Sequence, residues 1–397
     1  MNPLVPPRLP TVFHIRSSSG LFGADRVVLD LCAELGAAGY RAVLVPLIEP
    51  DGTGAALRRA GEELGLPVRP LRLAGRFDLR AAAMLRRLAA AEGALVLHGH
   101  DYKSNALVHL ARAPETWRVA TLHGRVGTDW KLRLYEAVDA RLVRRFDRVI
   151  CVSAAMRAAE MRGGFVPTLV VNGIDCAPFR DAPAPDPGLK ASLGLPEDAP
   201  VVGSIGRLSA EKGFAVLLRA AARLMADRPL LHVLLVGEGP ERHALMDLAA
   251  SLGLGDRVRM PGLRADTPAL YRLFDVFCMP SYREGLPLVL LEALAAGAAA
   301  VVTPVGGIRD VLGAGEERDD GVALTSPPGD VAALASAIAR LLDDPELRRR
   351  LGHAGSERVA QHFSRAAMAR ATACLYDELR QGRPAGGRRL NGAESGA

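Results

Sequence analysis

Two carboxylates, Glu284 and Glu292, flank the start of an apolar helix pattern and give the clearest sign of chemistry in the chain. Residues 281–297 read Ser-Tyr-Arg-Glu-Gly-Leu-Pro-Leu-Val-Leu-Leu-Glu-Ala-Leu-Ala-Ala-Gly. Pro287 suits the first helical position, where its missing N–H costs nothing, and Gly297 suits the position just past the helix end. Glu292 lies among apolar neighbours, where a lone carboxylate is costly unless a polar group meets it.

The helix start next to Glu284 is also a predicted anion site. Gly285 and Leu286 would offer free backbone N–H groups at a helix N-terminus, which favours negative charge. N–H groups for phosphate and carboxylates for hydroxyls together suit a sugar nucleotide. The alternative is a buried helix capped by a glutamate, with Glu292 paired to a neighbouring arginine.

A second candidate for anion binding follows the predicted strand at 201–205. The chain continues Gly-Arg-Leu-Ser-Ala-Glu-Lys-Gly, which places Arg207 and Lys212 five residues apart between glycines. These two cations can straddle a diphosphate, because arginine offers a planar fork and lysine a compact charge. A solvated loop before a helix is the alternative.

Other polar or glycine-containing turns also follow predicted strands. The turn at 237–242 lacks the third glycine of the dinucleotide fingerprint, which disfavours a nicotinamide site. The turn at 17–25 could bring its backbone close to a phosphate. His98, His100 and His123 end or follow strands, and no metal-ligand spacing connects them.

Short apolar runs alternate with helical patterns nearly throughout, which predicts parallel α/β layers. The predicted strands form two sets, one at 11–15, 41–46, 95–98, 119–123 and 149–152, the other at 201–205, 232–236, 257–260, 276–279 and 300–303. A Pro/Ala/Asp stretch at 182–187 separates the sets. Two Rossmann-like domains are therefore expected, with ligands at the carboxyl ends of their strands.

Composition excludes several classes of protein. The 397 residues are 49% hydrophobic and 24% charged, which is typical of a globular chain of two domains. The five cysteines are scattered without any C-x-x-C pair, as in reduced intracellular proteins. No apolar run is long enough to span a bilayer, and the first residues do not read as a signal peptide. A cytoplasmic location is expected.

Positive charge is concentrated in the first half of the chain. Residues 1–180 hold 25 Lys and Arg against 17 Asp and Glu, whereas the remainder holds 25 against 27. The stretch 130–148 predicts an amphipathic helix with a basic face, and peripheral contact with the inner face of an anionic membrane is the alternative to a solvated face. Nucleic acid is disfavoured because aromatic residues for base stacking are only 5% of the chain.

From about residue 12 to residue 376, these motifs resemble the retaining glycosyltransferases of family 4, a GT-B fold group. Glu284 and Glu292 match the family's Glu-x7-Glu signature, which implies that the first contacts the donor sugar and the second the nucleotide ribose. Arg207 and Lys212 match the basic positions of its diphosphate-binding motif. They would stabilise the leaving nucleoside diphosphate, so no metal and no cofactor are expected.

The resemblance also implies roles for glycines and histidines. His123 matches a catalytic histidine that contacts the donor sugar. His100 and Lys103 match an acceptor-side loop. Family members usually carry two adjacent glycines in the first turn, whereas this chain separates them. The remaining residues implied in donor binding are Gly20, Gly23, Gly239, Gly262, Gly285, Leu286 and Pro287.

The fold expected from the resemblance is an α/β GT-B fold, with two Rossmann-like domains facing across a cleft and a C-terminal helix returning to the N-terminal domain. The expected divisions are an acceptor-side domain at 1–180, a donor-binding domain at 181–360, the returning helix at 361–380 and a disordered tail at 381–397. The expected reaction moves a sugar from a UDP- or GDP-sugar to a glycan or lipid-linked oligosaccharide in exopolysaccharide or cell-envelope synthesis. A nucleotide-sugar epimerase or hydrolase of the same fold, or a basic nucleic-acid or membrane-surface binding protein, remain alternatives.

Overall fold

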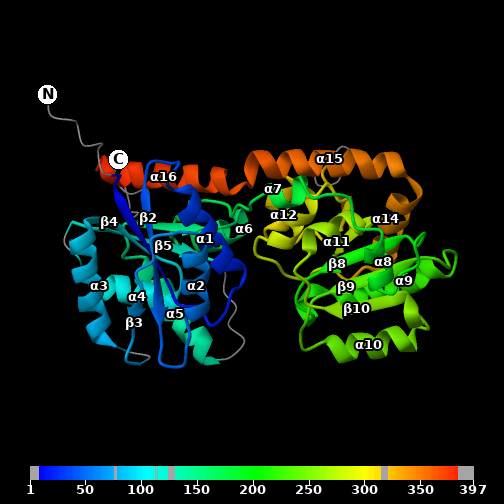
Figure 1. Cartoon of the computed structure of the whole chain (residues 1–397), viewed down its shortest axis with the longest axis horizontal. Coiled ribbons are helices and arrows are strands. Elements are labelled where there is room, and N and C mark those ends of the chain that lie inside the picture. The colour runs from blue at the N-terminus through cyan, green and yellow to red at the C-terminus, as the bar shows by residue number, and fades with distance from the viewer. Residues whose placement is uncertain are drawn as a thin grey trace, which may run out of the picture. The chain divides into compact units, whose positions relative to one another are not determined.

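The structure is a computed structural model that describes residues 9–75, 78–111, 113, 115–123, 130–313 and 321–382. The chain forms two compact units. Unit 1 consists of residues 1–173 and 365–397, and unit 2 consists of residues 174–364. Each unit has its own parallel sheet covered by helices (Figure 1).

Unit 1 is built on a parallel sheet whose described strands run in the order β3-β2-β1-β4-β5-β6-β7. The strands are β1 Thr11–Arg16, β2 Arg41–Ile48, β3 Leu71–Arg72, β4 Ala94–Gly99, β5 Trp117–Leu122, β6 Arg148–Cys151 and β7 Thr168–Leu169. The helices are α1 Gly23–Glu34, α2 Ala55–Glu63, α3 Leu79–Glu92, α4 Tyr102–Ala111, α5 Trp130–Val143, α6 Ala154–Arg162 and α16 Arg365–Arg380. The strand order reverses direction between β1 and β4, which is where doubly wound sheets bind ligands.

Unit 2 repeats this plan, with its described strands in the order β10-β9-β8-β11-β12-β13. The strands are β8 Val201–Ile205, β9 His232–Val236, β10 Val258–Gly262, β11 Val276–Met279, β12 Ala300–Val302 and β13 Leu324–Thr325. The helices are α7 Ala177–Arg180, α8 Gly188–Ser192, α9 Phe214–Met225, α10 Arg242–Ser251, α11 Thr267–Leu273, α12 Leu288–Ala295, α13 Ile308–Leu312, α14 Val331–Asp343 and α15 Pro345–His362. Here the switch lies between β8 and β11.

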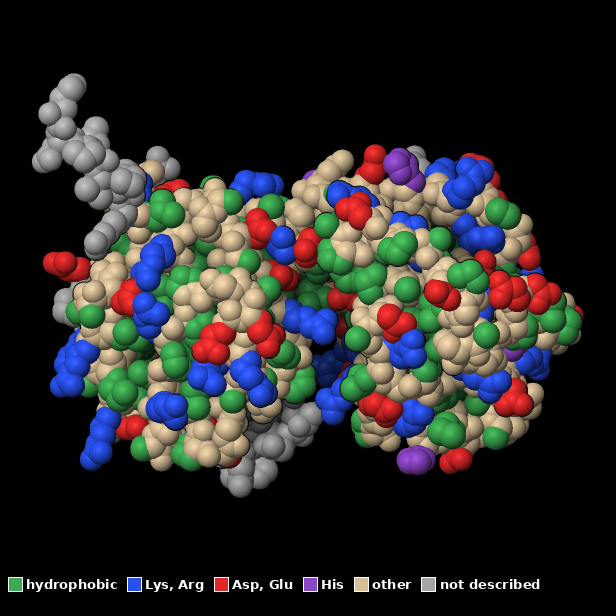
Figure 2. Space-filling model, viewed as in Figure 1, with side chains coloured by type: hydrophobic (Ala, Val, Ile, Leu, Met, Phe, Trp, Pro, Cys, Tyr) green, Lys and Arg blue, Asp and Glu red, His purple; other side chains and the backbone are tan. Residues whose placement is uncertain are grey.

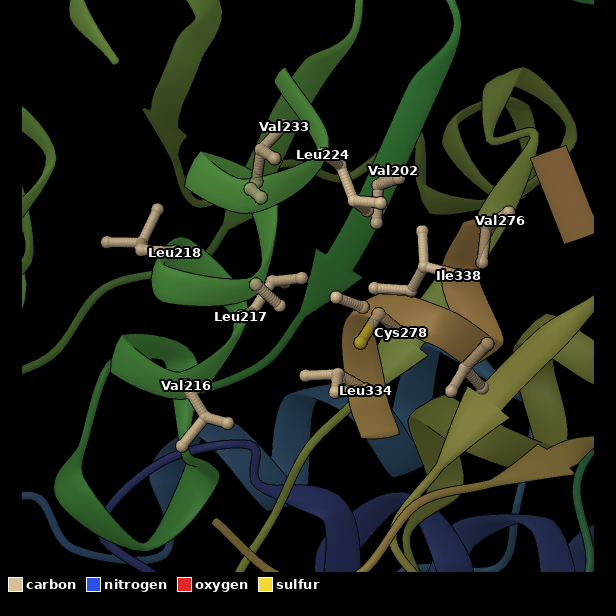
Figure 3. Close-up of a cluster of buried hydrophobic side chains, with 14 of the residues drawn as sticks. Val202, Val216, Leu217, Leu218, Leu224, Val233, Val276, Cys278, Leu334 and Ile338 are labelled. Carbon is tan, nitrogen blue, oxygen red and sulfur yellow. The ribbon is translucent and has the colours of Figure 1, made fainter. Parts of the chain in front are cut away.

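The core of unit 2 forms where the apolar stripes of α9 and α14 pack on the sheet. Leu217 of α9 and Ile338 of α14 are fully buried, and Figure 3 shows them beside Val202 and Cys278 of the neighbouring strands. These strands are buried on both faces, so they read in the sequence as continuous apolar runs. A rigid sheet of this kind fixes where the loops after its strands begin.

The C-terminal helix α16 returns to unit 1 and packs beside α1 (Figure 1). Tyr376 of α16 is fully buried and meets the ring of Tyr40 edge-on, with 5.3 Å between ring centroids. The Tyr40 hydroxyl donates to Asp377 at 2.7 Å. The helix that follows the second domain in sequence therefore completes the first.

The predicted strands agree closely with the central strands of both sheets. The short strands β3, β7 and β13 were not predicted, and neither were the helices α2, α4, α6, α7, α8, α13 and α15. The tail predicted to be disordered lies outside the described residues from residue 383 onward. None of the helices described has the length and apolar character needed to cross a membrane. On the visible face, basic and acidic side chains are interspersed over both units (Figure 2).

Candidate functional site

The candidate donor site lies in unit 2 at the switch between β8 and β11. The loop after β8 carries Arg207 and Lys212, and the loop after β11 carries Ser281 and Glu284. Because β8 and β11 are neighbours in the sheet, residues that are seventy positions apart in the sequence meet at the same sheet edge.

The centre of this site is a hydrogen-bonded cluster around the Glu284 carboxylate. Lys212 Nζ donates to Glu284 Oε1 at 2.7 Å and to Oε2 at 2.9 Å. Ser281 Oγ donates to Oε1 at 2.7 Å. The Glu284 side chain is only 6% exposed, and that of Lys212 is 22% exposed. The carboxylate is thus held in one orientation by two donors from two loops.

The backbone around Glu284 is braced by a third loop, which follows β12. The Gly307 N–H donates to the Gly285 carbonyl at 2.7 Å. Gly306 has φ of +53°, and a Cβ there would stand 1.9 Å from the Glu284 carbonyl oxygen. Only glycine permits this approach, so the loop after β12 fixes the turn that presents Glu284.

The loop that carries Arg207 is held by the turn after β9. The Leu208 N–H donates to the Glu238 carbonyl at 2.9 Å, and a Cβ on Gly239 would stand 2.2 Å from the Leu208 carbonyl oxygen. Gly262 ends β10, and its carbonyl accepts from the Gly237 N–H at 2.9 Å. Arg207 itself is exposed, and no described residue forms a hydrogen bond or ion pair with its guanidinium.

Helix α12 begins directly after this cluster. Pro287 was expected at the first helical position, but it is the N-cap residue, with an extended backbone at φ −78° and ψ 113°. Gly297 lies just past the helix end with φ of +78°, as expected. The N–H groups of Gly285 and Leu286 donate to no acceptor in the part of the chain that is described. They remain free at the N-terminus of the helix, where an anion is favoured.

The second signature carboxylate, Glu292, is buried within α12 and is 9% exposed. The hydroxyl of Tyr271, a fully buried residue of α11, donates to Glu292 Oε2 at 2.8 Å. The sequence analysis considered an arginine as the partner of Glu292, whereas the structure shows a tyrosine. Tyr271 and Ser281 were not identified from the sequence, because hydroxyl partners have no characteristic spacing.

The other predicted residues belong to unit 1. Gly20 lies in the turn after β1, and Gly23 begins α1. This turn is organised by Asp25, which is fully buried. Its carboxylate pairs with Arg16 at 2.6 Å and accepts from the hydroxyl of Ser18 and the backbone N–H of Phe22, each at 2.8 Å. The Asp25 carboxylate at the start of α1 thus holds the turn after β1 together through three contacts.

Three histidines of unit 1 form a hydrogen-bonded chain. His14 Nδ1 lies 3.0 Å from His100 Nε2, and His100 Nδ1 lies 3.2 Å from His123 Nε2. The ring centroids are 5.2 and 5.4 Å apart, so the facing nitrogens lie nearly on the lines between the ring centres. His123 Nδ1 and His14 Nε2 are buried and have no partner among the described residues. His14 was not identified from the sequence.

The histidine chain is neutral at physiological pH. Burial lowers the pKa of His14 to about 3, and burial together with the nearby Arg16 lowers that of His123 to about 3. Burial also holds the pKa values of His98 and His100 well below their usual range. Each ring therefore carries one N–H and one acceptor nitrogen.

Ligand atoms of His14, His98 and His100 lie within 4.8 Å of one another, a spacing that could suit a metal ion. However, His98 is engaged at both nitrogens, by the Tyr376 hydroxyl at 2.6 Å and the Thr121 hydroxyl at 2.7 Å. The His14–His100 nitrogens point at each other, which leaves no room for a metal between them at ordinary bond lengths. The geometry is that of a hydrogen-bonded cluster.

Lys103, predicted on the acceptor side, is not a free cation. Its ammonium forms an ion pair with Glu49, the residue after β2. The Lys103 side chain is 20% exposed and that of Glu49 is 11% exposed. Glu49 was not identified from the sequence, because its partner lies 54 positions away.

Comparison with known proteins places both halves in one family. Residues 187–358 match the model for glycosyl transferases group 1, and residues 23–177 match the model for glycosyltransferase family 4. A D-inositol 3-phosphate glycosyltransferase of Kineococcus radiotolerans is 36% identical over 269 residues, covering 62% of this chain and 60% of that protein. A glycogen synthase of Mycobacterium tuberculosis is 29% identical over 398 residues, covering 91% of this chain and 92% of that protein.

The fold is likewise shared with solved structures. Alr3699/HepE of Anabaena, solved in complex with UDP, superposes with a TM-score of 0.78 at 22% identity, covering 93% of this chain and all of that one. In this chain the shared fold consists of two doubly wound parallel sheets and a C-terminal helix that returns to the first unit. The chain therefore belongs to the group 1 glycosyltransferases of family 4 and has the GT-B fold.

Proposed function

We propose that this protein transfers a sugar from a UDP- or GDP-sugar to an acceptor with retention of configuration. The donor binds the loops after β8 and β11 of unit 2. The observation that carries the proposal is the Lys212–Glu284–Ser281 cluster beside the free N-terminus of α12. It combines, in one place, a cation, a fixed carboxylate and unpaired N–H groups, which are the groups that a diphosphate and a sugar ring need.

The diphosphate is bound by Arg207, Lys212 and the N–H groups of Gly285 and Leu286. Lys212 is held by Glu284 in this structure, so a diphosphate competes for the ammonium. When Lys212 turns to the phosphate, the Glu284 carboxylate becomes available to accept from sugar hydroxyls. Stabilising the departing diphosphate in this way is worth about 3–4 kcal/mol of barrier for each well-placed donor. This route needs no metal.

In this proposal Glu292 accepts hydrogen bonds from the ribose hydroxyls, and Tyr271 holds its carboxylate in place. His123 of unit 1 contacts the donor sugar. In the structure, one nitrogen of His123 is bonded to His100 and the other is buried, so a contact through either nitrogen requires the ring to turn. The acceptor attacks from the face that the diphosphate leaves, and the leaving phosphate assists its deprotonation.

The acceptor side is assigned to unit 1, around His100 and Lys103. A glycan or a lipid-linked oligosaccharide of exopolysaccharide or cell-envelope synthesis is the proposed acceptor class. The reaction would take place in the cytoplasm, with peripheral contact at the inner face of the membrane. Support for a glycan acceptor comes from the likeness to a glycogen synthase over nearly the whole chain.

A thermal-shift screen against UDP, GDP, ADP and their sugars tests the donor assignment, because a ligand that binds the native state stabilises it. Calorimetry on the best nucleotide should then show at least tenfold weaker binding for Arg207→Ala and for Lys212→Ala. Arg219→Ala, which removes an exposed arginine of α9, is the matched control. Unchanged affinity in both site variants would mean that the diphosphate binds elsewhere.

Product analysis tests the reaction itself. The anomeric configuration of the product, read by NMR, should match that of the donor. Turnover should persist in EDTA. An inverted product, or activity that requires a divalent metal, would contradict this mechanism, and sugar release in the absence of any acceptor would point to a hydrolase.

A further inference from the structure

The charged groups described at the strand ends of unit 1 carry no net positive charge. Glu49 binds the Lys103 ammonium, and Ser17 Oγ donates to Glu49 Oε1 at 3.3 Å. Asp101 accepts from the backbone N–H groups of Ser17 at 2.8 Å and Lys103 at 2.9 Å. The Glu49–Lys103 ion pair therefore connects the end of β2 to the start of α4, and the contacts of Asp101 with backbone N–H groups hold the start of α4 in place.

Counting the neighbouring described side chains gives this edge a net negative charge. Arg16 is neutralised by the buried Asp25, Lys103 is neutralised by Glu49, and Asp101 adds one further carboxylate. An anionic ligand gains no net attraction from such a group. A hydroxyl suits it well, because a hydroxyl can accept from the ammonium and donate to a carboxylate at the same time.

An apolar hollow of about 400 Å³ begins beside this ion pair, between α4 and α5. Its volume lies in the range of small-molecule sites, which are mostly apolar with a few polar groups. Lys103 contributes to its wall, where an alkyl stem can line apolar surface while the ammonium stays polar. The lining residues are Leu47, Leu73, Asp78, Tyr102, Lys103, Ala106, Leu107, Leu110, Leu134, Tyr135, Val138, Asp139 and Leu142.

The wall of the hollow leaves large apolar side chains open to water. Leu110 of α4 is 51% exposed, and Leu134 and Val138 of α5 are 53% and 55% exposed. Tyr102 and Tyr135 stack across the two helices, with ring centroids 5.5 Å apart and planes 13° from parallel. Covering such a surface with an apolar ligand is favourable, and a stacked aromatic pair provides a rigid wall for it.

We propose that this edge of unit 1 binds an acceptor composed of an uncharged polyol head and an apolar aglycone. The head lies against Glu49 and Lys103, and the aglycone lies in the hollow between α4 and α5. Glu49 is then a specificity residue, because it neutralises Lys103, whose ammonium would otherwise recognise a phosphorylated head. The inference rests on the proposed function, since it specifies the acceptor of that reaction.

The occupant is a single amphipathic molecule. A concave wall formed by two helices can enclose a single alkyl chain, whereas a membrane surface is bound by the convex apolar face of a helix. The polar pair at one end of the hollow fixes the orientation, with the head toward the strand ends where the reaction is proposed.

Alkyl glucosides used below their micelle concentrations test the hollow. Binding of methyl, hexyl and octyl glucoside, measured by calorimetry without donor, should strengthen with chain length, by up to roughly fourfold for each methylene that becomes buried. Leu134→Ser should remove most of this gain. Leu64→Ser is the matched control, because Leu64 is 56% exposed in the same unit and lies outside the hollow. The proposal is overturned by affinity that does not depend on chain length, by equal effects of the two variants, or by binding to lipid vesicles alone.

The head specificity is tested with octyl glucoside and its 6-phosphate. The parent protein should prefer the uncharged probe. Glu49→Gln, which frees the Lys103 charge without changing shape, should raise the relative affinity for the phosphorylated probe at least tenfold, and Glu49→Gln with Lys103→Met should abolish that gain. A parent preference for the phosphate, or an unchanged ratio in Glu49→Gln, overturns the assignment of Glu49.

The same variants separate this inference from the proposed function. UDP binding depends on unit 2, so it should be unchanged in Glu49→Gln and in Leu134→Ser. If glucosides bind as expected but no sugar nucleotide does, the proposed reaction fails and the amphiphile site stands. If sugar nucleotides bind but no glucoside does, the amphiphile site fails and the proposed donor site stands.

Discussion

At the scale of single residues, the two signature glutamates occupy different environments. Glu284 is ion-paired with Lys212 and accepts from Ser281, so its side chain is held in one orientation at the sheet edge. Glu292 is buried in the middle of α12, where the hydroxyl of Tyr271 meets it. Glu284 can therefore exchange its lysine partner for a ligand, whereas the Glu292 carboxylate is held in place by a buried tyrosine.

Glu284→Gln should reduce turnover by about 10²-fold or more while leaving the fold intact, because a neutral amide has one accepting oxygen in place of two and binds the Lys212 ammonium and sugar hydroxyls less strongly than a carboxylate. Turnover is measured with the best nucleotide sugar from the binding screen, and folding by thermal unfolding. Glu197→Gln, at an exposed loop position, is the control. Near-normal turnover in Glu284→Gln would remove this residue from the mechanism.

Tyr271→Phe should lower the free energy of unfolding by about 1.5–3 kcal/mol, the usual worth of a hydrogen bond to a charged group. The change removes only the hydroxyl that donates to Glu292. Urea unfolding of the variant and the parent measures it. An unchanged midpoint would show that the Tyr271 hydroxyl does not stabilise the buried carboxylate.

At the scale of elements, the candidate donor site consists of loops held by a rigid sheet. The loops after β8, β11 and β12 meet because their strands are adjacent, and glycines let their backbones come within contact distance. Lys212 and Glu284 come from two of these loops, and Gly306 and Gly307 from the third. The positions of the functional groups therefore depend on close backbone contacts between loops.

Gly307→Ala tests this dependence. A Cβ at residue 307 would stand 2.2 Å from the Gly285 carbonyl oxygen, which belongs to the backbone and cannot move aside alone. We expect a loss of about 1–3 kcal/mol in stability and weaker binding of nucleoside diphosphate, because the turn before α12 must shift. Gly36→Ala, where a Cβ meets nothing within 4 Å, should leave both nearly unchanged. Equal behaviour of the two variants would show that the loop after β12 does not brace the site.

Elements differed in how well the sequence predicted them. Strands β8, β9 and β11 were predicted with the bounds that the structure shows, because each is a run of mostly apolar residues that is buried on both faces of the sheet. Strands β3, β7 and β13 have two residues each, too few for a period to be visible. Helix α15 was missed because its 18 residues are rich in arginine and glycine and have little apolar character.

At the scale of the whole molecule, the two units depend on different interiors. The core of unit 2 is almost entirely aliphatic (Figure 3). Unit 1 has an apolar core of the same kind and, in addition, a cluster of buried neutral histidines, connected to α16 through the contact between His98 and Tyr376. Such a cluster is stable only while its members remain uncharged, so unit 1 should be the more sensitive to acid.

Unit 1 should lose stability as the pH falls below about 6.5. The pKa values of His14 and His123 are lowered to about 3 in the folded protein, so between pH 6.5 and 3 the unfolded chain binds protons that the folded chain does not. For each such histidine, the free energy of unfolding falls by about 1.4 kcal/mol for every unit by which the pH drops within this window. Above pH 6.5 the folded protein has its full stability from these neutral histidines.

Urea unfolding followed by tryptophan fluorescence measures this effect in unit 1, because both tryptophans, Trp117 and Trp130, belong to it. The midpoint should stay nearly constant between pH 7.5 and pH 6.5 and fall steeply from there to pH 5. His353→Gln, which removes an exposed histidine of unit 2, should leave the slope unchanged. A midpoint that does not change over this range would show that the histidines are not buried as neutral groups.

The sequence alone determined the fold class and the motifs of the candidate donor site, because both depend on local patterns. Periodic apolar runs specify parallel α/β units, and the spacing of Glu284, Glu292, Arg207 and Lys212 is written in short segments of contiguous chain. Their roles in the reaction are predictions that the experiments above test.

Only the tertiary structure decided which groups meet. Glu49 neutralises Lys103, Tyr271 binds Glu292, and three histidines from separate strands form a chain. Adjacent parallel strands bring such residues together from positions far apart in the sequence, so no local spacing records the contact. The electrostatic character of each site follows from those contacts, which is why a lysine that appears cationic in the sequence is neutralised in the fold.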